Sequence, residues 1–233
     1  DGPLDPMPAS RQMRIANLNG YASLVRSRGG DPIALLERHR IDPSVIRDPD
    51  QLIDCQSVVD LFEYSSSALN DPLFGLHLAR LQNPEVFGCV AALCGAAATV
   101  RDSVNCFIDF IPVIHAPDTL LQLVEGKTTA EVRWSVGTDL GANDQANYQA
   151  ALLTLKLLQW VGGKSFRPGQ VNLAVDVRRS DVAELEQQLG CRFNRTQTEN
   201  AIAFPVQLLN QAVAGSSRLL YNLLGGYLRQ VKT

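Results

Sequence analysis

The stretch TLLQLVEGKTTAEVRWSV, residues 119–136, decides the fold because the spacing of apolar residues changes here from helical to strand-like. Two strand-like runs flank Gly126-Lys127, an arrangement that is typical of a β-hairpin. If Gly126 and Lys127 are the two turn residues, one apolar face of the hairpin carries Leu121, Leu123, Ala130, Val132 and Trp134. The segment therefore predicts the first two strands of a sheet.

The sequence before this hairpin predicts helices. Asp-Pro pairs recur in it, at 31–32, 42–43, 48–49 and 71–72. An Asp side chain accepts hydrogen bonds from the free amides of a helix start, and Pro fits the first helical position, where no amide hydrogen is needed. We therefore expect helices to begin after Asp31-Pro32 and after Asp71-Pro72, with Asp54 capping another helix between them.

Two further helices are predicted at 86–98 and 100–111, just before the hairpin. Thr99 and Asp102 have the spacing of a capping box, which separates the two helices. Pro112 is expected to end the second helix, because proline lacks the amide hydrogen that a helix interior needs. The first helix is rich in glycine and alanine, and such small side chains let another element or a ligand approach the backbone closely.

Helices and strands alternate after the hairpin. The predicted elements are a helix at 144–161, a strand at 170–177, a helix that Ser180 caps, a second hairpin from 191–196 and 200–206, and a final helix at 216–233. The order of the second half is therefore ββα-βα-ββ. A helical N-terminal half followed by a mixed β-sheet packed with helices predicts the α+β class.

Composition and charge narrow the class of protein. Of the 233 residues 45% are apolar and 19% are charged, and the formal net charge is −3, whereas nucleic-acid-binding domains usually carry a basic patch. The apolar runs at 86–100 and 146–161 are too short or too interrupted to span a bilayer, so a soluble chain without a membrane partner is expected. Five cysteines without a signal peptide fit reduced thiols, which predicts a cytoplasmic location.

The cysteines show little sign of catalysis or metal binding. Cys89 and Cys94 are five residues apart and point in directions about 140° apart on a helix. No CxxC pair and no ligand-spaced histidine pair exists, so neither a metal nor a cofactor is expected. Two interpretations rival that of buried, inert cysteines. One is a nucleophile formed by His115 with Cys94 or Cys106, and the other is redox sensing through Cys89, Cys94 or Cys106. We therefore expect a binding protein rather than an enzyme.

Aromatic and polar side chains around the hairpin are candidates to line an apolar pocket. They are Phe87, Phe107, Phe110, His115, Trp134 and Tyr148. An apolar cavity with a few polar anchors is the usual composition of a small-molecule site. The rival interpretation is that these side chains only fill the core.

The order of the motifs resembles that of the N-terminal effector-binding, arabinose-binding-like domain of AraC/XylS-family transcriptional regulators. The segments that carry the likeness contain GGDP at 29–32, IDP at 41–43, DPLFGL at 71–76, FGCVAALCGAAATVRDSVN at 87–105, GCRF at 190–193 and ENAIAF at 199–204. The resemblance implies a cytoplasmic bacterial regulator domain that senses a small-molecule effector. It implies no enzyme activity.

The resemblance also implies a division of the chain. Residues 15–215 would form the effector-binding domain, and 1–14 would be a tail or a cloning remnant. Residues 216–233 would form a helix that leads to an absent C-terminal domain with helix-turn-helix motifs. DNA would be bound only through that absent domain.

The pocket of such a domain would lie between the 86–111 helices, the 119–136 hairpin and the 144–161 helix, with Cys94 in its wall. The final helix is expected to mediate homodimer or interdomain contact through Leu220, Leu223, Leu224 and Tyr227. Two rival functions remain, an oligomerisation module without ligand and a cysteine-dependent enzyme.

Overall fold

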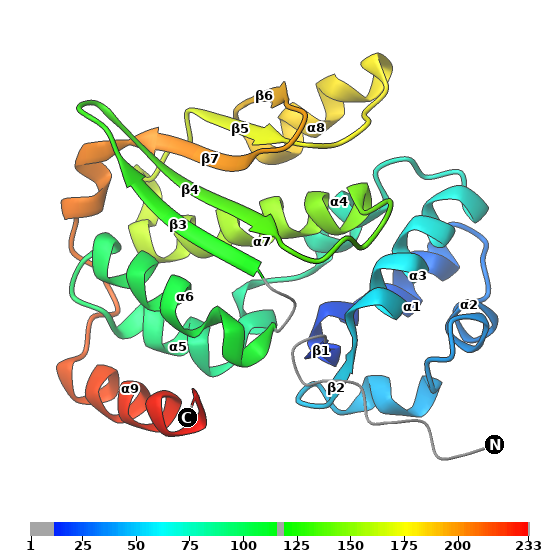
Figure 1. Cartoon of the computed structure of the whole chain (residues 1–233), viewed down its shortest axis with the longest axis horizontal. Helices are drawn as coiled ribbons and strands as arrows, with labels where there is room; N and C mark the ends of the chain where they lie inside the picture. The colour runs from blue at the N-terminus through cyan, green and yellow to red at the C-terminus, as the bar shows by residue number, and fades with distance from the viewer. Residues whose placement is uncertain (1–11, 116–118, 233) are drawn as a thin grey trace.

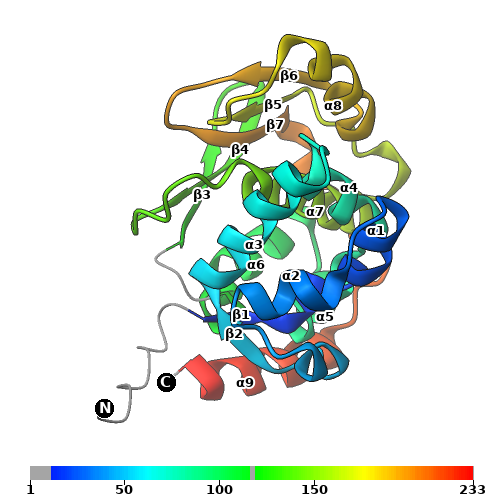
Figure 2. The ribbon, with the colours of Figure 1, turned by 90° about the vertical axis from the view of Figure 1, so that its right-hand side faces the viewer.

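The computed structural model describes residues 12–115 and 119–232, which form an N-terminal helical layer beside a sheet with its covering helices (Figure 1, Figure 2). The N-terminal elements are β1 (Gln12–Arg14), the 3₁₀-helix η2 (Ile15–Leu18), α1 (Tyr21–Ser27), α2 (Pro32–Arg38), η3 (Pro43–Arg47), β2 (Leu52–Asp54), α3 (Cys55–Ala68) and α4 (Phe74–Leu81). The rings of Tyr21, Phe62 and Phe74 contact one another in a buried cluster of this layer. The predicted helical first half is confirmed.

Two of the three predicted Asp caps are present. The Asp31 carboxylate accepts a hydrogen bond from the Ile33 amide at 3.0 Å, at the start of α2. The Asp54 carboxylate accepts from the Ser57 amide at 2.9 Å, at the start of α3. These caps satisfy amides that the first helical turn leaves free, so both helices begin where the sequence predicted.

The third predicted helix, over 73–81 after Asp71-Pro72, is present, but Asp71 is not at its capping position. The helix α4 begins at Phe74, and Leu73 occupies the capping position without a side-chain cap. The Asp71 carboxylate is buried and bonds the ring nitrogen Nδ1 of His77 at 2.8 Å. Asp71 is therefore engaged mainly in a buried ion pair with its own helix.

Residues 12–14, which the sequence places in the N-terminal tail, form the strand β1. This strand pairs antiparallel with β2, and the Met13 side chain is buried. Arg14 Nη1 donates to the backbone oxygen of Val86 at 2.7 Å. A strand of three residues is too short for its alternation to be recognised, which is why the folded part begins earlier than the expected boundary at residue 15.

The two helices predicted before the hairpin are present with different bounds. They are α5 (Cys89–Ala96) and α6 (Val100–Ile114), and a short 3₁₀-helix, η4 (Pro84–Phe87), precedes them. Gly88 separates η4 from α5 with a φ of +56°, a conformation that glycine adopts without a steric cost. Thr99 Oγ1 accepts from the Asp102 amide at 3.2 Å, so the predicted cap between the helices is confirmed.

Pro112 does not end α6, which is a correction to the sequence prediction. The helix continues to Ile114, and the His115 amide donates to the Ile111 carbonyl at 2.8 Å. Pro112 lies in the last turn, where its missing amide hydrogen removes one helical bond and leaves the following bonds in place.

The second half contains a five-stranded mixed sheet, as predicted for the α+β class. Its strands are β3 (Thr119–Glu125), β4 (Thr129–Val136), β5 (Gln170–Leu173), β6 (Arg192–Arg195) and β7 (Asn200–Pro205), and their order across the sheet is β3-β4-β7-β5-β6. With α7 (Asp144–Gly162) and α8 (Val182–Leu189) between them, they follow the predicted ββα-βα-ββ sequence. Short 3₁₀ turns η5 (Gly163–Ser165), η6 (Arg179–Asp181) and η7 (Val206–Asn210) connect them.

The first hairpin has the predicted apolar face but a different turn. The Gly126 amide donates to the Thr129 carbonyl at 2.8 Å, so Lys127 and Thr128 are the turn residues. Moving the turn by one position shifts the register by two residues, which leaves every side chain on its original face. The inward-facing residues of β4 are accordingly buried.

The predicted second hairpin is wrong, because β6 and β7 do not pair. β5 lies between them, parallel to β6 and antiparallel to β7. The helix α8 carries the crossover that a parallel pair requires. β7 is largely buried and takes an inner position, whereas β6 exposes Arg192 and Arg195 at the edge, where charged side chains discourage further strand pairing.

Ser180 does not cap α8. Residues 179–181 form the turn η6, and α8 begins at Val182 with Asp181 at its capping position. Asp181 receives a hydrogen bond from Arg178 Nε at 2.7 Å. Asp181, and not the predicted Ser180, is therefore the residue directly before α8.

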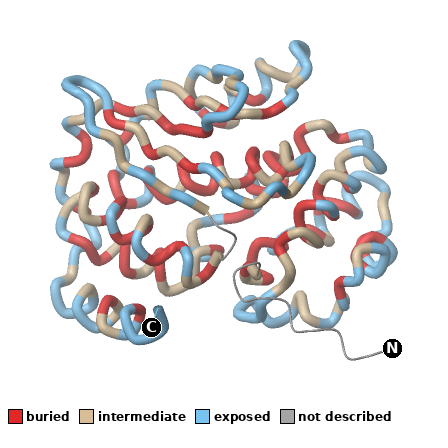
Figure 3. The backbone as a smooth tube through the Cα atoms, in the orientation of Figure 1, coloured by how far each residue is buried: buried red, intermediate tan, exposed pale blue. Residues whose placement is uncertain are grey.

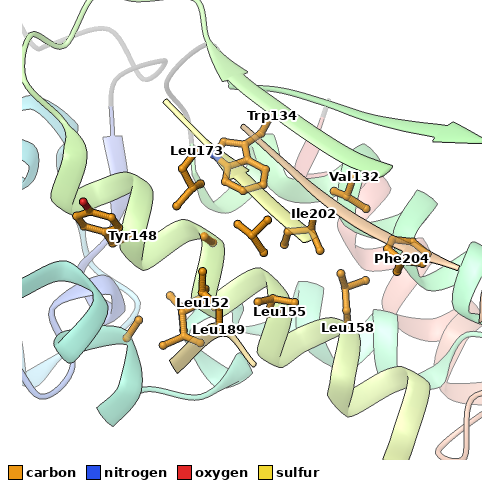
Figure 4. Packing of buried hydrophobic residues seen from close by; sticks show 14 of the residues in the cluster. Val132, Trp134, Tyr148, Leu152, Leu155, Leu158, Leu173, Leu189, Ile202 and Phe204 are labelled. Carbon is orange, nitrogen blue, oxygen red and sulfur yellow. The ribbon is translucent and has the colours of Figure 1, made fainter. Parts of the chain in front are cut away.

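The helix α7 is the centre of the fold, as the red, buried tube in Figure 3 shows. Leu152, Leu155 and Leu158 of α7 face the inner side of the sheet, where Val132 and Ile202 point toward them (Figure 4). On another side α7 crosses α4 closely. The last helix, α9 (Arg218–Lys232), lies against α5 and α6 and is largely exposed (Figure 3).

Candidate ligand-binding site

A cavity lies where the N-terminal layer meets the hairpin, α6 and α7. It offers about 110 Å³ to the centres of water-sized molecules, which is room for several waters or one compact ligand. The hairpin β3-β4 forms one wall, α6 and α7 form two others, and α3 closes the remaining side. The cavity therefore lies between the N-terminal layer and the continuous stretch of chain from α6 to α7.

The cavity wall is mostly apolar. Its apolar side chains are Met13, Cys55, Val58, Val59, Phe62, Phe87, Phe107, Ile111, Leu121, Trp134, Val136, Leu140, Ala146, Ala150 and Leu153. Its polar side chains are Asn17, His115, Thr119, Asn143, Asn147, Gln149 and Thr154. This composition, apolar with a few polar groups, is typical of small-molecule sites.

Two side chains of this wall each carry a polar atom that has no hydrogen-bond partner among the described residues. These atoms are the indole nitrogen Nε1 of Trp134 and the hydroxyl Oγ1 of Thr119, and both are buried. Leu121 pairs with Trp134 across the hairpin, so Thr119 lies on the same face as Trp134 and diagonally beside it. Leaving a buried donor unpaired costs about 1–3 kcal/mol, and folded proteins seldom do so.

His115 follows α6 and contributes its ring to the same wall. Burial lowers the pKa of the imidazole to about 4, since removal from water disfavours the charged form. The ring is therefore neutral at neutral pH, with one nitrogen that donates and one that accepts.

A buried amide network holds one end of the cavity. Gln149 of α7 donates from Nε2 to the Asn17 carbonyl at 2.9 Å and to Gln82 Oε1 at 3.0 Å. Gln82 Nε2 donates to the same Asn17 carbonyl at 2.9 Å. These bonds join η2, the end of α4 and α7, so the N-terminal layer and the central helix are tied together beside the cavity.

Four of the side chains that the sequence proposes for a pocket line this cavity. They are Phe87, Phe107, His115 and Trp134. Phe87 and Phe107 contact each other edge to face, with ring centroids 5.0 Å apart. The cavity also has the expected place beside α6, the hairpin and α7.

The structure places Cys94, Phe110 and Tyr148 outside this lining. Cys94 is buried between α5 and α6, where the Ser103 hydroxyl donates to its carbonyl at 2.5 Å. Phe110 belongs to the cluster between α5, α6 and α9, and Tyr148 packs into the core beneath the sheet. The α5 helix is thus a packing surface, and Gly95 leaves room for the Trp160 ring of α7, which a Cβ atom would meet at 2.3 Å.

Sequence reasoning missed the contribution of the N-terminal layer and of Thr119. Met13 lies on a strand too short to predict, and Val58 and Phe62 form a helical apolar stripe whose partner a local pattern does not reveal. Thr119 could have been predicted from the sequence, because side chains alternate along a strand and this puts Thr119 on the same face as Leu121 and Trp134.

Four of the five cysteine thiols have a raised pKa. All five cysteines are free, and burial raises the pKa of Cys55 to about 12 and that of Cys191 to about 11. Burial also raises the pKa of Cys94 and of Cys106. A nucleophilic cysteine needs a lowered pKa, so these four side chains do not fit a cysteine-dependent enzyme.

Within residues 12–115 and 119–232, no cluster of three or more His, Cys, Asp or Glu side chains is arranged to hold a metal ion. No helix in the described part of the chain combines the length and hydropathy needed to cross a membrane.

The predicted contact residues of α9 divide into two groups. Leu220, Leu223 and Tyr227 are exposed, and Leu224 is half-buried against α5 and α6. Leu219, which is 72% exposed, extends the exposed group. One face of α9 therefore holds the helix on the domain, and another presents apolar side chains to solvent.

Comparison with known proteins gives relatives of one kind. HTH-type transcriptional regulators named VirS, from two strains of Mycobacterium tuberculosis (CDC 1551 / Oshkosh and ATCC 25618 / H37Rv), are each 29% identical over 191 residues. The alignment covers 79% of this chain and 55% of each relative, so the chain spans about half the length of these curated relatives.

The fold also occurs in a solved structure, the transcriptional regulator CdpR from Pseudomonas aeruginosa. The TM-score is 0.59 at 15% identity, over 85% of this chain and 63% of that one. The model of the arabinose-binding domain of AraC transcription regulators, an N-terminal domain, matches residues 29–213. This match spans the N-terminal layer from α2 onward, most of the cavity lining and the whole five-stranded sheet. The chain therefore belongs to the family of N-terminal arabinose-binding domains of AraC transcription regulators.

Proposed function

We propose that this domain senses a small-molecule effector in the cavity and transmits its presence to the DNA-binding part of the regulator. The observation that carries the proposal is the cavity at the junction of the N-terminal layer, the hairpin and two helices. In its wall, Trp134 and Thr119 each carry a polar atom without a hydrogen-bond partner in the described part of the chain. A ligand that bridges these parts favours one arrangement of them over others.

The helix α6 is the proposed route from the cavity to α9. Phe107 and Ile111 of α6 line the cavity. Next to them, Cys106 Sγ donates to the Tyr221 hydroxyl of α9 at 3.4 Å. The Lys232 ammonium of α9 donates to the Asp109 carbonyl of α6 at 2.8 Å. A ligand that displaces α6 therefore changes the contacts between α6 and α9, and with them the position of α9.

Ligand binding is tested by thermal unfolding against a metabolite library. A ligand at 100 times its Kd stabilises the folded state by about 2.7 kcal/mol, or about 5–11 °C at about 2–4 °C per kcal/mol. Ala150→Phe fills the cavity, and Ala183→Phe adds the same ring at an exposed position of α8. We expect a ligand to stabilise the wild type and Ala183→Phe and to lose its effect on Ala150→Phe. Equal stabilisation of both variants would place the ligand elsewhere and contradict the proposal.

We propose in addition that α9 forms a homodimer contact. Its exposed apolar face includes Leu219, Leu220, Leu223 and Tyr227. An exposed apolar stripe on a terminal helix is the kind of surface that a second copy covers. The same stripe fits an oligomerisation module without ligand, which the ligand screen distinguishes.

Sedimentation of a dilution series tests the dimer. Leu223→Glu puts a charge into the centre of the α9 stripe, and Ile33→Glu makes the same kind of change on the exposed face of α2. We expect Leu223→Glu to weaken self-association by at least tenfold while Ile33→Glu leaves it unchanged. Equal self-association of Leu223→Glu and wild type would exclude this face.

In this proposal, residues outside the present chain recognise DNA in the whole regulator. The named relatives are helix-turn-helix regulators, and the alignment covers 55% of their length. A net charge of −3 supports a sensing role for the present part. Such a regulator acts in the cytoplasm, where free thiols such as those found here persist.

A further inference from the structure

The described side chains that line the cavity are all uncharged at neutral pH. Most are apolar, and the polar ones are amides, hydroxyls and the neutral ring of His115. Transfer of an ion from water to such surroundings costs several kcal/mol unless a counter-charge is supplied. A sugar would in turn need a hydrogen-bond partner for each buried hydroxyl. The wall therefore favours a molecule that is itself mainly apolar.

The unpaired atoms define what polar group that molecule carries. Trp134 Nε1 is a donor only, and the Thr119 hydroxyl can donate or accept. The hairpin register holds both on one face as diagonal neighbours. One carbonyl oxygen has two lone pairs, so it can accept from both groups at once.

We infer that the cavity takes a compact, mainly apolar molecule with one uncharged carbonyl oxygen, which accepts hydrogen bonds from the Trp134 indole and the Thr119 hydroxyl. This inference rests on the proposed sensing function and adds the ligand class to it. An apolar cavity of about 150 Å³ in a protein binds benzene. The cavity volume here, about 110 Å³, is smaller than that, so it suits a ligand of at most about one ring, and a short substituent on the ring requires small shifts of the lining side chains.

Probes of one shape and different polarity test the inference. Acetophenone has a ring and an uncharged carbonyl group, ethylbenzene lacks the oxygen, and benzoate replaces the carbonyl group with a charged one. Arabinose represents the polyols. Binding is followed by the indole Nε1–H signal of Trp134 in NMR spectra, which Trp134→Phe assigns because the chain has two tryptophans. We expect acetophenone to shift this signal and to bind about tenfold more tightly than ethylbenzene, and benzoate and arabinose to bind more weakly than either.

Two variants connect the preference to the two groups. Trp134→Phe and Thr119→Val remove one hydrogen-bonding group each and keep most of the side-chain volume. We expect each to reduce the preference for acetophenone over ethylbenzene to about threefold or less, with ethylbenzene affinity unchanged. The affinities of both variants are taken from the rise of the unfolding midpoint with probe concentration, because Trp134→Phe lacks the indole signal. Unfolding curves of both variants confirm that they are folded.

The outcomes separate the inference from the proposed function. Tighter binding of benzoate or arabinose than of acetophenone overturns the ligand class but leaves a ligand-binding cavity. Equal affinity for acetophenone and ethylbenzene in the wild type overturns the role of the carbonyl oxygen. If no probe moves the Trp134 signal and no library compound stabilises the domain, both the inference and the sensing function fail.

Discussion

Replacing Gly75 with alanine tests the close crossing of α4 and α7, which holds the N-terminal layer beside the cavity. A Cβ atom on Gly75 would lie 1.9 Å from the carbonyl oxygen of Gln145 and 2.6 Å from its carbonyl carbon. Ordinary contact begins at 3.4 Å, so the two helices would have to move apart by about 1.5 Å. The atoms in the way are backbone, which cannot rotate aside as a side chain can.

This separation also breaks polar contacts between the helices. The Gly75 amide donates to Gln145 Oε1 at 2.8 Å, and Gln145 Nε2 donates to the Pro72 carbonyl at 2.9 Å. Overpacking costs about 1–3 kcal/mol and each lost hydrogen bond about 1 kcal/mol, so we expect a loss of about 3–5 kcal/mol. Against a total stability of about 5–15 kcal/mol this is a large fraction. The midpoint of thermal unfolding should fall by about 6–20 °C.

Equilibrium unfolding in urea, followed by circular dichroism, measures the loss. Gly226→Ala is the matched control, because Gly226 lies within α9 and a Cβ atom there meets nothing within 4 Å. Alanine is the better helix former, so this variant should gain about 0.5–1 kcal/mol. A loss below about 1 kcal/mol for Gly75→Ala, or an equal loss for Gly226→Ala, would refute the reasoning from the crossing.

Three further predictions use other contacts. Both ring nitrogens of His77 bond carboxylates, Asp71 at 2.8 Å and Glu184 at 2.5 Å, and the bond to Asp71 contributes most to its raised pKa. The resulting stabilisation is present below about pH 6.5 and lost as pH rises through the raised pKa, so urea unfolding of His77→Gln should lack this pH dependence. Cys94 is buried, and burial raises the pKa of its thiol, so a thiol reagent should reach it only when the domain unfolds. Peptide mass spectrometry should therefore show that Cys94 is labelled at the rate of unfolding. Thr99→Ala should cost about 1 kcal/mol in urea unfolding through loss of its cap, and Thr99→Ser should restore most of it.

Much of the local structure could be predicted because it depends on neighbours in sequence. The caps at Asp31, Asp54 and Thr99 and the apolar face of the first hairpin each involve residues a few positions apart. Asp71 shows where such reasoning fails. Its carboxylate bonds both the Leu73 amide, just before the helix, and the ring nitrogen Nδ1 of His77. The bond to the ring nitrogen is the shorter one, at 2.8 Å against 3.2 Å.

The candidate site could be predicted only in part for the same reason. Four aromatic or polar residues near the hairpin in sequence were predicted to line a pocket, and they do line the cavity: Phe87, Phe107, His115 and Trp134. Phe110 is also an aromatic residue near the hairpin in sequence, but its side chain packs toward α9. Which face of α6 meets the cavity depends on how the helix is rotated between α5, α7 and α9, which its own sequence does not specify.

The sequence by itself determined the α+β class, the order of helices and strands and the faces of the first hairpin, since these depend on caps and on apolar spacing within a few residues. Only the tertiary structure decided the strand order and the cavity. β5 enters between β6 and β7 because burial of the whole sheet favours an inner β7 and an edge β6. The unpaired donor of Trp134 likewise becomes visible only when residues from β1 to α7 enclose it, since whether a buried group is satisfied is a property of every element around it.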